Sequence, residues 1–329
     1  PGMEWWNALR ASGGLYFGFL AVLGAVAGSF ASAAIYRLPR EGLSVLRPAR
    51  SFCPSCDTQL RWFDNIPLLS YLLLRGRCRS CGARYGPVYL LNELGLAGLF
   101  AFAGTTWAAD AGPAALGLLL VALTALWIAA VVDWNHMILP DEITLGGIPF
   151  GFLAAVAAPG FQLWEPGRLP WGVAWLGLGP ESGPVTLALA SAGLGCLGAF
   201  LLLFGIRALF SYLLRQEAMG FGDVKYMASV GALVGLEGSA WTLMVGVAVG
   251  AVLGVLNIVR MIFVVHQRRI ARARAKSFRS STHLGWLLGR QIPFGPPLVL
   301  GTGLVLLAPG ATHTFFLQTW PDWIQAWIR

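Results

Sequence analysis

Two aspartates stand beside apolar segments that could enter a membrane. Asp133 directly follows the run LTALWIAAVV, and Asp223 precedes the run YMASVGALVG. Ionisable side chains in such segments are costly and point to function. Two carboxylates that share one proton can activate water and protonate a scissile amide. No Ser–His–Asp or Cys–His set is apparent, because the four histidines stand in different loops. The pattern therefore favours a two-carboxylate hydrolase.

The residues around Asp223 and one further acid are candidates for supporting roles. Gly220 and Gly222 permit close approach of a neighbouring helix or of an extended peptide. Lys225 has two interpretations, a group that stabilises the aspartates or substrate and an interfacial lysine whose ammonium reaches water. Glu93 lies within an apolar segment, where it either supports the chemistry or packs between helices.

Four cysteines form a second constellation. CPSC places two residues between Cys53 and Cys56, CRSC does the same for Cys78 and Cys81, and 21 residues separate the pairs. Two such turns can complete a tetrahedral zinc site with four thiolate ligands. The alternatives are disulfides or free thiols, but this loop is predicted to be cytoplasmic, where disulfides rarely persist. We predict a structural zinc ion that folds a small domain.

The composition predicts a polytopic membrane protein. Of 329 residues, 57% are hydrophobic and 12% charged, and the mean hydropathy is +0.67. A soluble domain is about one quarter charged, and about 20 apolar residues span a bilayer as a helix. We predict an all-α protein with about eight transmembrane helices, at residues 15–36, 88–107, 113–132, 143–158, 185–210, 219–236, 240–265 and 292–307.

The predicted domains follow from these segments. Residues 1–36 form an N-terminal segment and the first membrane helix, and residues 37–87 form the cytoplasmic zinc-binding domain. Residues 88–329 form a seven-helix catalytic membrane domain with an external loop at 159–184 and a basic cytoplasmic loop at 266–290. Pro1 and Gly2, which precede Met3, are interpreted as a cloning remnant, and we expect no cleavable signal peptide.

The positive charge predicts orientation and not nucleic-acid binding. The net charge is +8, but arginines gather in the loops 37–87, 207–218 and 266–290, which alternate with loops poor in Lys and Arg. The positive-inside rule places these three loops in the cytoplasm and both termini outside it. The turn 133–142 lacks Lys and Arg although it is predicted to be cytoplasmic, which leaves Asp133 without a cationic neighbour there.

Five stretches together resemble the prepilin peptidases, also called type IV leader peptidases. These are GSFASAAIYRLP (28–39), the stretch from Cys53 to Glu93 that contains both cysteine pairs (53–93), VVDWNHMILPDEIT (131–144), EAMGFGDVKYMASVGALVG (217–235) and IPFGPPLVLG (292–301). They cover 96 of 329 residues, a little under a third of the chain, in the family's order. The combination is more specific than any single motif.

The resemblance implies a fold, a reaction and its partners. It implies a membrane-embedded aspartic protease in which Asp133 and Asp223 are catalytic, the latter in a Gly-x-Gly-Asp motif shared with presenilin-type proteases. Its members remove a short basic leader from prepilins and pseudopilins at the cytoplasmic face of the bacterial inner membrane, for type IV pili or type II secretion. The four-cysteine loop is typical of bifunctional members, so the resemblance also implies N-methylation with S-adenosylmethionine, and Glu93 becomes a candidate for that transfer.

Some alternatives stay open at the level of sequence. An ion- or proton-coupled transporter could use the two aspartates and Lys225 as a relay, and an assembly protein could use the cysteine loop for docking. A transporter favours mid-membrane sites and repeated halves, whereas these acids gather near one face and no repeat is evident. No glycine-rich cofactor loop is evident, so the S-adenosylmethionine site has no sequence signature.

Overall fold

The computed structural model describes residues 3–45, 47–48, 50–164, 167–217, 219–271 and 293–328. These residues are largely helical, which confirms the predicted all-α class, and their extended pairings are two isolated bridges in the cysteine loop. The helices are α1 (Glu4–Ala11), α2 (Gly14–Arg37), α3 (Leu69–Leu73), α4 (Val88–Ala103), α5 (Trp107–Ala111), α6 (Pro113–His136), α7 (Asp141–Thr144), α8 (Gly147–Ala157), α9 (Pro184–Leu214), α10 (Phe221–Ala271), α12 (Gly295–Leu307), α13 (Pro309–Thr314) and α14 (Trp320–Ile328). Short turns of other helix types occupy Trp62–Asn65, Pro159–Phe161, Val173–Leu176 and Phe315–Thr319.

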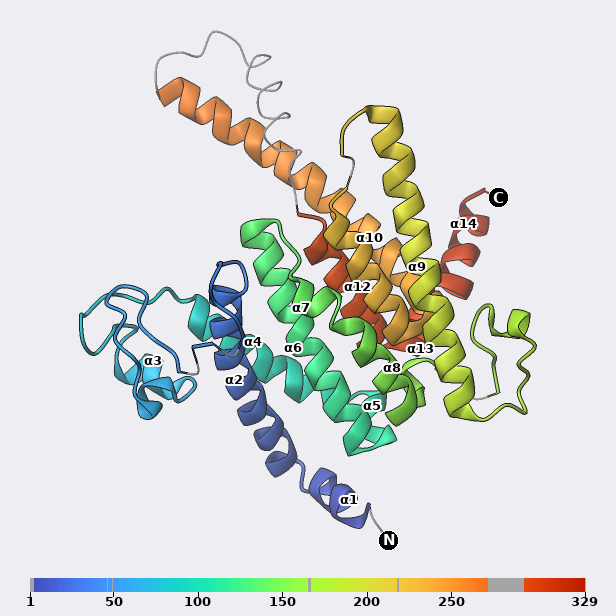
Figure 1. The fold of residues 1–329 in the computed structure, drawn as a ribbon, viewed down its shortest axis with the longest axis horizontal. Coiled ribbons are helices and arrows are strands. Elements are labelled where there is room, and N and C mark those ends of the chain that lie inside the picture. The colour runs from blue at the N-terminus through green and yellow to red at the C-terminus, as the bar shows by residue number, and fades with distance from the viewer. Residues whose placement is uncertain are drawn as a thin grey trace.

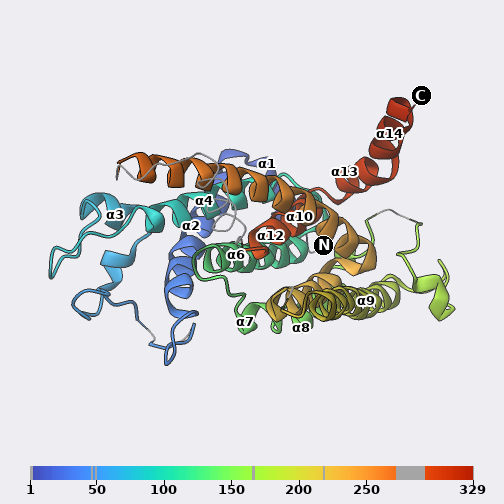
Figure 2. The ribbon, with the colours of Figure 1, turned by 90° about the horizontal axis from the view of Figure 1, so that it is seen from above.

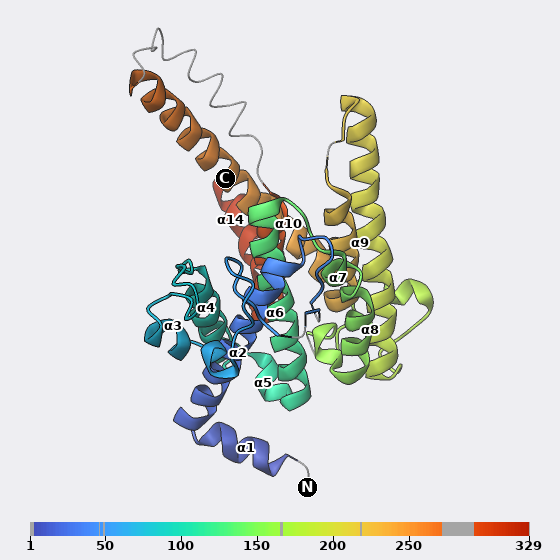
Figure 3. The same ribbon diagram turned by 60° about the vertical axis from the view of Figure 1, so that its left-hand side comes forward.

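Figures 1 and 2 show a helical bundle with one lobe at its edge. The lobe, residues 38–87, carries α3 and projects from the ends of α2 and α4; we call it the cysteine lobe. At the opposite side of the bundle, α9 stands beside α8 and the first part of α10, which Figure 3 shows from another direction.

Four helices in the described part of the chain are long and apolar enough to cross a membrane. They are α2, α6, α9 and α10 as far as Gln267; α12 and the helical segment after it, bent by 109°, would make a fifth. The predicted count of eight is therefore not confirmed. Helix α4 has 16 residues and α8 has 11, and 11 residues extend only about 16 Å against a hydrocarbon thickness of about 30 Å.

Helices α2 and α4 meet through small residues. A methyl group added to Gly24 would lie 2.4 Å from the carbonyl oxygen of Leu96, and one added to Gly28 would lie 2.4 Å from Cα of Glu93. This spacing of two glycines lets the helix backbones touch. A hydrogen bond of 3.0 Å from Nδ2 of Asn92 to Oγ of Ser32 joins the same helices.

Helix α10 folds back on itself at Gly235, where φ is 73° and ψ is −177°. The parts of α10 before and after Gly235 contact the same place on α12. Before Gly235, Tyr226 forms a hydrogen bond of 2.7 Å with Thr302. After it, the carbonyl oxygen of Thr242 would lie 2.5 Å from a methyl group added to the adjacent Gly301. Tyr226 and Thr242 would be about 24 Å apart along a straight helix. The chain must therefore reverse between them, in agreement with the predicted division into segments 219–236 and 240–265.

Polar groups stabilise this reversal. A helix that breaks leaves carbonyl groups without their usual partners. Nε2 of Gln162 donates to the carbonyl oxygens of Ala232 and Leu233, each at 2.8 Å, and Oε1 of Gln162 accepts from Ser191 at 2.9 Å. The predicted external loop 159–184 thereby reaches into the helix break through Gln162, in addition to carrying the exposed Trp175.

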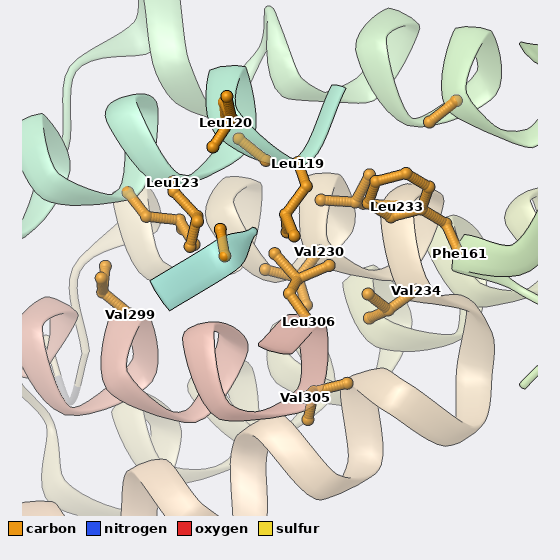
Figure 4. Close-up of a cluster of buried hydrophobic side chains, with 14 of the residues drawn as sticks. Leu119, Leu120, Leu123, Phe161, Val230, Leu233, Val234, Val299, Val305 and Leu306 are labelled. Atoms are coloured by element: carbon orange, nitrogen blue, oxygen red, sulfur yellow. The ribbon is translucent and has the colours of Figure 1, made fainter. Parts of the chain in front are cut away.

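The centre of the bundle is an apolar core between α6, α10 and α12. Figure 4 shows Leu119 and Leu123 of α6 facing Val230 of α10 and Leu306 of α12, all of them buried. In contrast, α2, α9 and the part of α10 that follows Gly235 present rows of exposed large apolar side chains, as expected for helices that face lipid. Most of the predicted basic loop 266–290, from residue 272 onward, lies outside the described residues.

Candidate functional site

Asp133 lies in the last turn of α6 and is held by the start of α12. The helix extends beyond the predicted 113–132 and ends at His136, because Met137 adopts a left-handed conformation (φ 55°). Asp133 is 5% exposed, and its carboxylate accepts a hydrogen bond of 3.0 Å from the backbone N–H of Gly295. A methyl group on Gly295 would lie 2.5 Å from Oδ2 of Asp133, so glycine is required for this contact.

Asp223 lies in the first turn of α10, near the N-terminus of its helix, whereas Asp133 lies near the C-terminus of α6. The N-terminal turn of a helix favours a negative charge. A methyl group on Gly220 would lie 3.5 Å from Oδ2 of Asp223, and one on Gly222 would lie 3.4 Å from Cβ of Leu139. Gly222 therefore lets the start of α10 pack against the chain that follows Asp133.

These contacts bring the two aspartates into one pocket. Asp133, Asp223, Gly220 and Gly222 line it together with the residues between α6 and α7, and the carboxylates are close enough to interact electrostatically. We call it the aspartate pocket. It lies where α6 ends and α10 begins, on the side of the bundle toward which α2 also ends (Figure 1).

Lys225 lines the aspartate pocket but is paired with a residue that sequence reasoning did not assign to it. Its Nζ lies 2.7 Å from Oδ1 of Asp141 in the first turn of α7. Nothing in the sequence spacing indicates that α7 would face α10. Lys225 thereby links α7 to α10 at the rim of the pocket.

Glu93 is not part of the aspartate pocket. It is 8% exposed, and its Oε2 accepts a hydrogen bond of 2.7 Å from the backbone N–H of Leu68 in the cysteine lobe. It lines a different pocket between α2, α4 and the lobe. The structure therefore separates Glu93 from the other candidate residues.

The four cysteines come together as the spacing predicts. Their sulfur atoms all lie within 4.8 Å of one another, and those of Cys53 and Cys81 are 3.9 Å apart. Sulfurs about 2.3 Å from one ion in a tetrahedron are about 3.8 Å apart. The cluster therefore has the ligand chemistry and the size to hold a metal ion.

The two cysteine turns are built alike. Asp57 N–H donates to the carbonyl of Cys53, and Gly82 N–H donates to that of Cys78, each at 2.9 Å. Asp57 and Gly82 both have positive φ, at 52° and 69°, a conformation that glycine adopts without strain. Each cysteine pair therefore presents its thiols through the same local hydrogen bonds.

Local hydrogen bonds also favour the thiolate form of Cys78, whereas the neighbouring cysteine sulfurs raise the pKa of Cys81 to about 11. Hydrogen bonds led by the backbone N–H of Cys81, with that of Ser80 in addition, lower the pKa of Cys78 to about 6. Cys53 and Cys78 are buried, at 0% and 4% exposure. The fifth cysteine, Cys196 in α9, lies outside this cluster.

Two family models match the chain in tandem. The Bacterial Peptidase A24 N-terminal domain matches residues 22–107, and the Type IV leader peptidase family matches residues 120–255. The first match contains the four cysteines and Glu93, and the second contains both aspartates. No solved structure matches the chain.

Individual relatives carry names that agree with these matches. A prepilin leader peptidase/N-methyltransferase of Klebsiella pneumoniae is 34% identical over 235 residues, covering 70% of this chain and 90% of the relative. One of Stutzerimonas stutzeri is 30% identical over 322 residues, covering 90% and 92%. A type 4 prepilin-like proteins leader peptide-processing enzyme of Escherichia coli O78:H11 is 32% identical over 231 residues, covering 64% and 74%. The chain belongs to the type IV leader peptidase family.

Proposed function

We propose that this chain is an endopeptidase that removes the short basic leader from type IV prepilins and pseudopilins. The observation that carries the proposal is the aspartate pocket, in which Asp133 and Asp223, 90 positions apart in sequence, line one opening. One carboxylate would accept a proton from water while the other, protonated, would donate to the amide nitrogen that leaves.

The surrounding residues have proposed roles in this reaction. Gly220 and Gly222 leave room for an extended substrate backbone beside Asp223, since neither carries a side chain into the pocket. The N–H of Gly295 fixes one oxygen of Asp133, which leaves the other oxygen for water. Lys225, held by Asp141, positions the start of α10 at the rim.

We place the aspartate pocket at the cytoplasmic face of a bacterial inner membrane. The chain carries nine arginines between residues 37 and 87, the cysteine lobe and the end of α2, and positive loops are retained in the cytoplasm. The ends of α2 and α6 and the start of α10 lie toward one side of the bundle (Figure 1), which supports a common face for the lobe and the pocket. Prepilins of a type IV pilus or type II secretion system would present their leaders there.

The second part of the proposal is N-methylation of the new N-terminus with S-adenosylmethionine. It is supported by the relatives named as N-methyltransferases and by the separate N-terminal family match. The ion in the four-cysteine cluster is proposed to be zinc, because a closed tetrahedral set of four thiolates is typical of structural zinc. The transporter alternative gains no support from the relatives.

Cleavage of a purified prepilin by the full chain tests the peptidase. We expect Asp133→Asn and Asp223→Asn each to lower the rate by about a thousandfold or more, because each removes one member of the acid–base pair. Asp110→Asn is the matched control, since Asp110 is exposed and pairs with Arg10. Near-normal cleavage by either pocket variant would overturn the two-aspartate mechanism.

A further inference from the structure

The pocket that contains Glu93 is distinct from the aspartate pocket in position and in chemistry. It lies between α2, α4 and the cysteine lobe, and we call it the lobe pocket. Its empty space, together with the open solvent at its mouth, is about 820 Å³. Five aromatic side chains line it, from Tyr36, Phe52, Tyr71, Tyr85 and Tyr89.

The lobe pocket has charged groups fixed in an apolar frame. Glu93 is 8% and Arg37 5% exposed, and both line it. Arg37 donates to the carbonyls of Val45 and Arg50, at 2.9 and 3.3 Å, so its guanidinium is held in place. A buried carboxylate and a buried guanidinium together suit a ligand that bears both signs of charge.

We propose that the lobe pocket binds S-adenosylmethionine. This assignment rests on the proposed N-methylation and identifies the site at which the methyl donor would bind. The donor combines an adenine ring, a sulfonium and an ammonium group, and one carboxylate. Aromatic faces stack on a purine and attract a sulfonium cation. The carboxylate of Glu93 would neutralise a cationic part of the ligand, and the guanidinium of Arg37 would face its carboxylate.

The aspartate pocket fits such a ligand less well. Its charged lining includes three carboxylates, from Asp133, Asp141 and Asp223, against Lys225. None of its lining residues within the described chain is aromatic. The lining itself therefore offers a purine no aromatic ring, and we assign the two reactions to two pockets.

Packing and hydrogen bonds hold the residues around Glu93 in place. Gly28 packs on the backbone of Glu93, and Asn92 is held between Ser32 and the indole N–H of Trp127. The N–H of Leu68, a residue with a positive φ of 62°, donates to Glu93. Helix packing thus fixes the floor of the pocket, while the cysteine lobe covers it.

The test measures binding and not only methylation. Radiolabelled S-adenosylmethionine is titrated into the purified full chain, with Glu93→Gln, Tyr89→Leu and Tyr89→Phe as variants. Glu93→Gln keeps an oxygen for the N–H of Leu68 but loses the charge, so we expect affinity about tenfold to a hundredfold weaker. Tyr89→Leu removes a ring and should weaken binding about tenfold, whereas Tyr89→Phe keeps the ring and should bind within about threefold of wild type.

Controls separate binding from folding. Glu4→Gln removes an exposed carboxylate in α1, far along the chain from both pockets, and should bind as wild type does. Metal content and thermal unfolding of every variant report whether the lobe is intact. Ultraviolet crosslinking of the labelled donor should mark peptides from residues 29–37, 51–60 or 71–93.

The outcomes distinguish this assignment from the proposed function. Unchanged affinity in both Glu93→Gln and Tyr89→Leu, or label in the peptides that contain Asp133 or Asp223, would overturn the lobe pocket alone. A wild-type chain that neither binds nor uses S-adenosylmethionine would overturn both the methyl transfer and its site.

Discussion

The cysteine lobe and the aspartate pocket reach their geometry by different routes. In the lobe, each cysteine pair is shaped by hydrogen bonds between residues four or five positions apart, such as Asp57 to Cys53 and Gly82 to Cys78. In the aspartate pocket, Asp133, Gly295 and Asp223 come from three helices and meet only through packing. Local turns and a metal can assemble the first, whereas the second depends on the whole bundle.

This difference predicts that the two regions can be damaged separately, and among changes outside the two aspartates the largest effect is expected at the metal. Replacing Cys53 or Cys78 by Ser leaves three thiolate ligands, and structural sites of this kind lose metal and fold together. We expect metal content to fall to near zero and methyl transfer to fall by about a hundredfold or more. Leader cleavage should stay within about fivefold.

Cys196→Ser is the control within the same chain, because Cys196 lies outside the cluster. It should leave metal content and both activities unchanged. Equal loss of cleavage and methyl transfer in Cys53→Ser would show that the bundle needs the lobe, contrary to the proposed independence.

The converse change is Gly295→Ala, which should harm cleavage and spare the lobe. The added methyl would lie 2.5 Å from Oδ2 of Asp133, so the carboxylate must move. A displacement of about 1 Å near reacting groups can cost about a hundredfold in rate. We expect a loss of that order in cleavage kcat, with S-adenosylmethionine binding unchanged. Gly303→Ala in the same helix, with nothing within 4 Å, should cleave normally.

A smaller effect is expected where the lobe pocket rests on the bundle. Gly28→Ala would place a methyl 2.4 Å from Cα of Glu93 and force α2 away from α4. Overpacking of this kind costs about 1–3 kcal/mol, seen as a lower unfolding temperature, and donor affinity should fall about tenfold. Gly18→Ala, on the same helix with no near neighbour, should change neither quantity.

The smallest effect is expected at the pocket rim. Asp141 is 60% exposed and Lys225 23%, and ion pairs that face water contribute little. Lys225→Met and Asp141→Asn should therefore each lower cleavage only about twofold to fivefold, measured as kcat/KM. A loss approaching that of Asp223→Asn would mean that Lys225 contacts substrate and is more than a link between α7 and α10.

The sequence predicted residues whose spacing is local better than those whose contacts are distant. The two CxxC turns could be derived from spacing alone, because both turns are complete within six residues. The predicted segment 219–236 also placed Asp223 near the start of its helix, in agreement with its position in the first turn of α10. The role of the Gly295 N–H could not be predicted, because every residue except proline has a backbone N–H and this one lies 162 positions from Asp133 in the sequence.

Helix lengths were predicted less well for a related reason. Apolar composition indicates which segments avoid water, but α8 stops after 11 residues because Ala158 departs from helical geometry (φ −149°) before Pro159. Glu93 was grouped with the aspartates because both types of acid lie in apolar segments. Their separation into two pockets depends on how α2 packs against α4, which composition does not encode.

The fold-back at Gly235 has a consequence for how Asp133 and Asp223 are aligned. The arm from Phe221 to Val234 has 14 residues, about 21 Å, and Asp223 lies at one end while Gln162 and Ser191 hold the other. A rigid rod that is fixed at its base transmits any shift of the base to its tip. The depth of Asp223 relative to Asp133 therefore depends on contacts at the far end of the arm, so a change in the loop that carries Gln162 would alter the alignment of the aspartates without touching either of them.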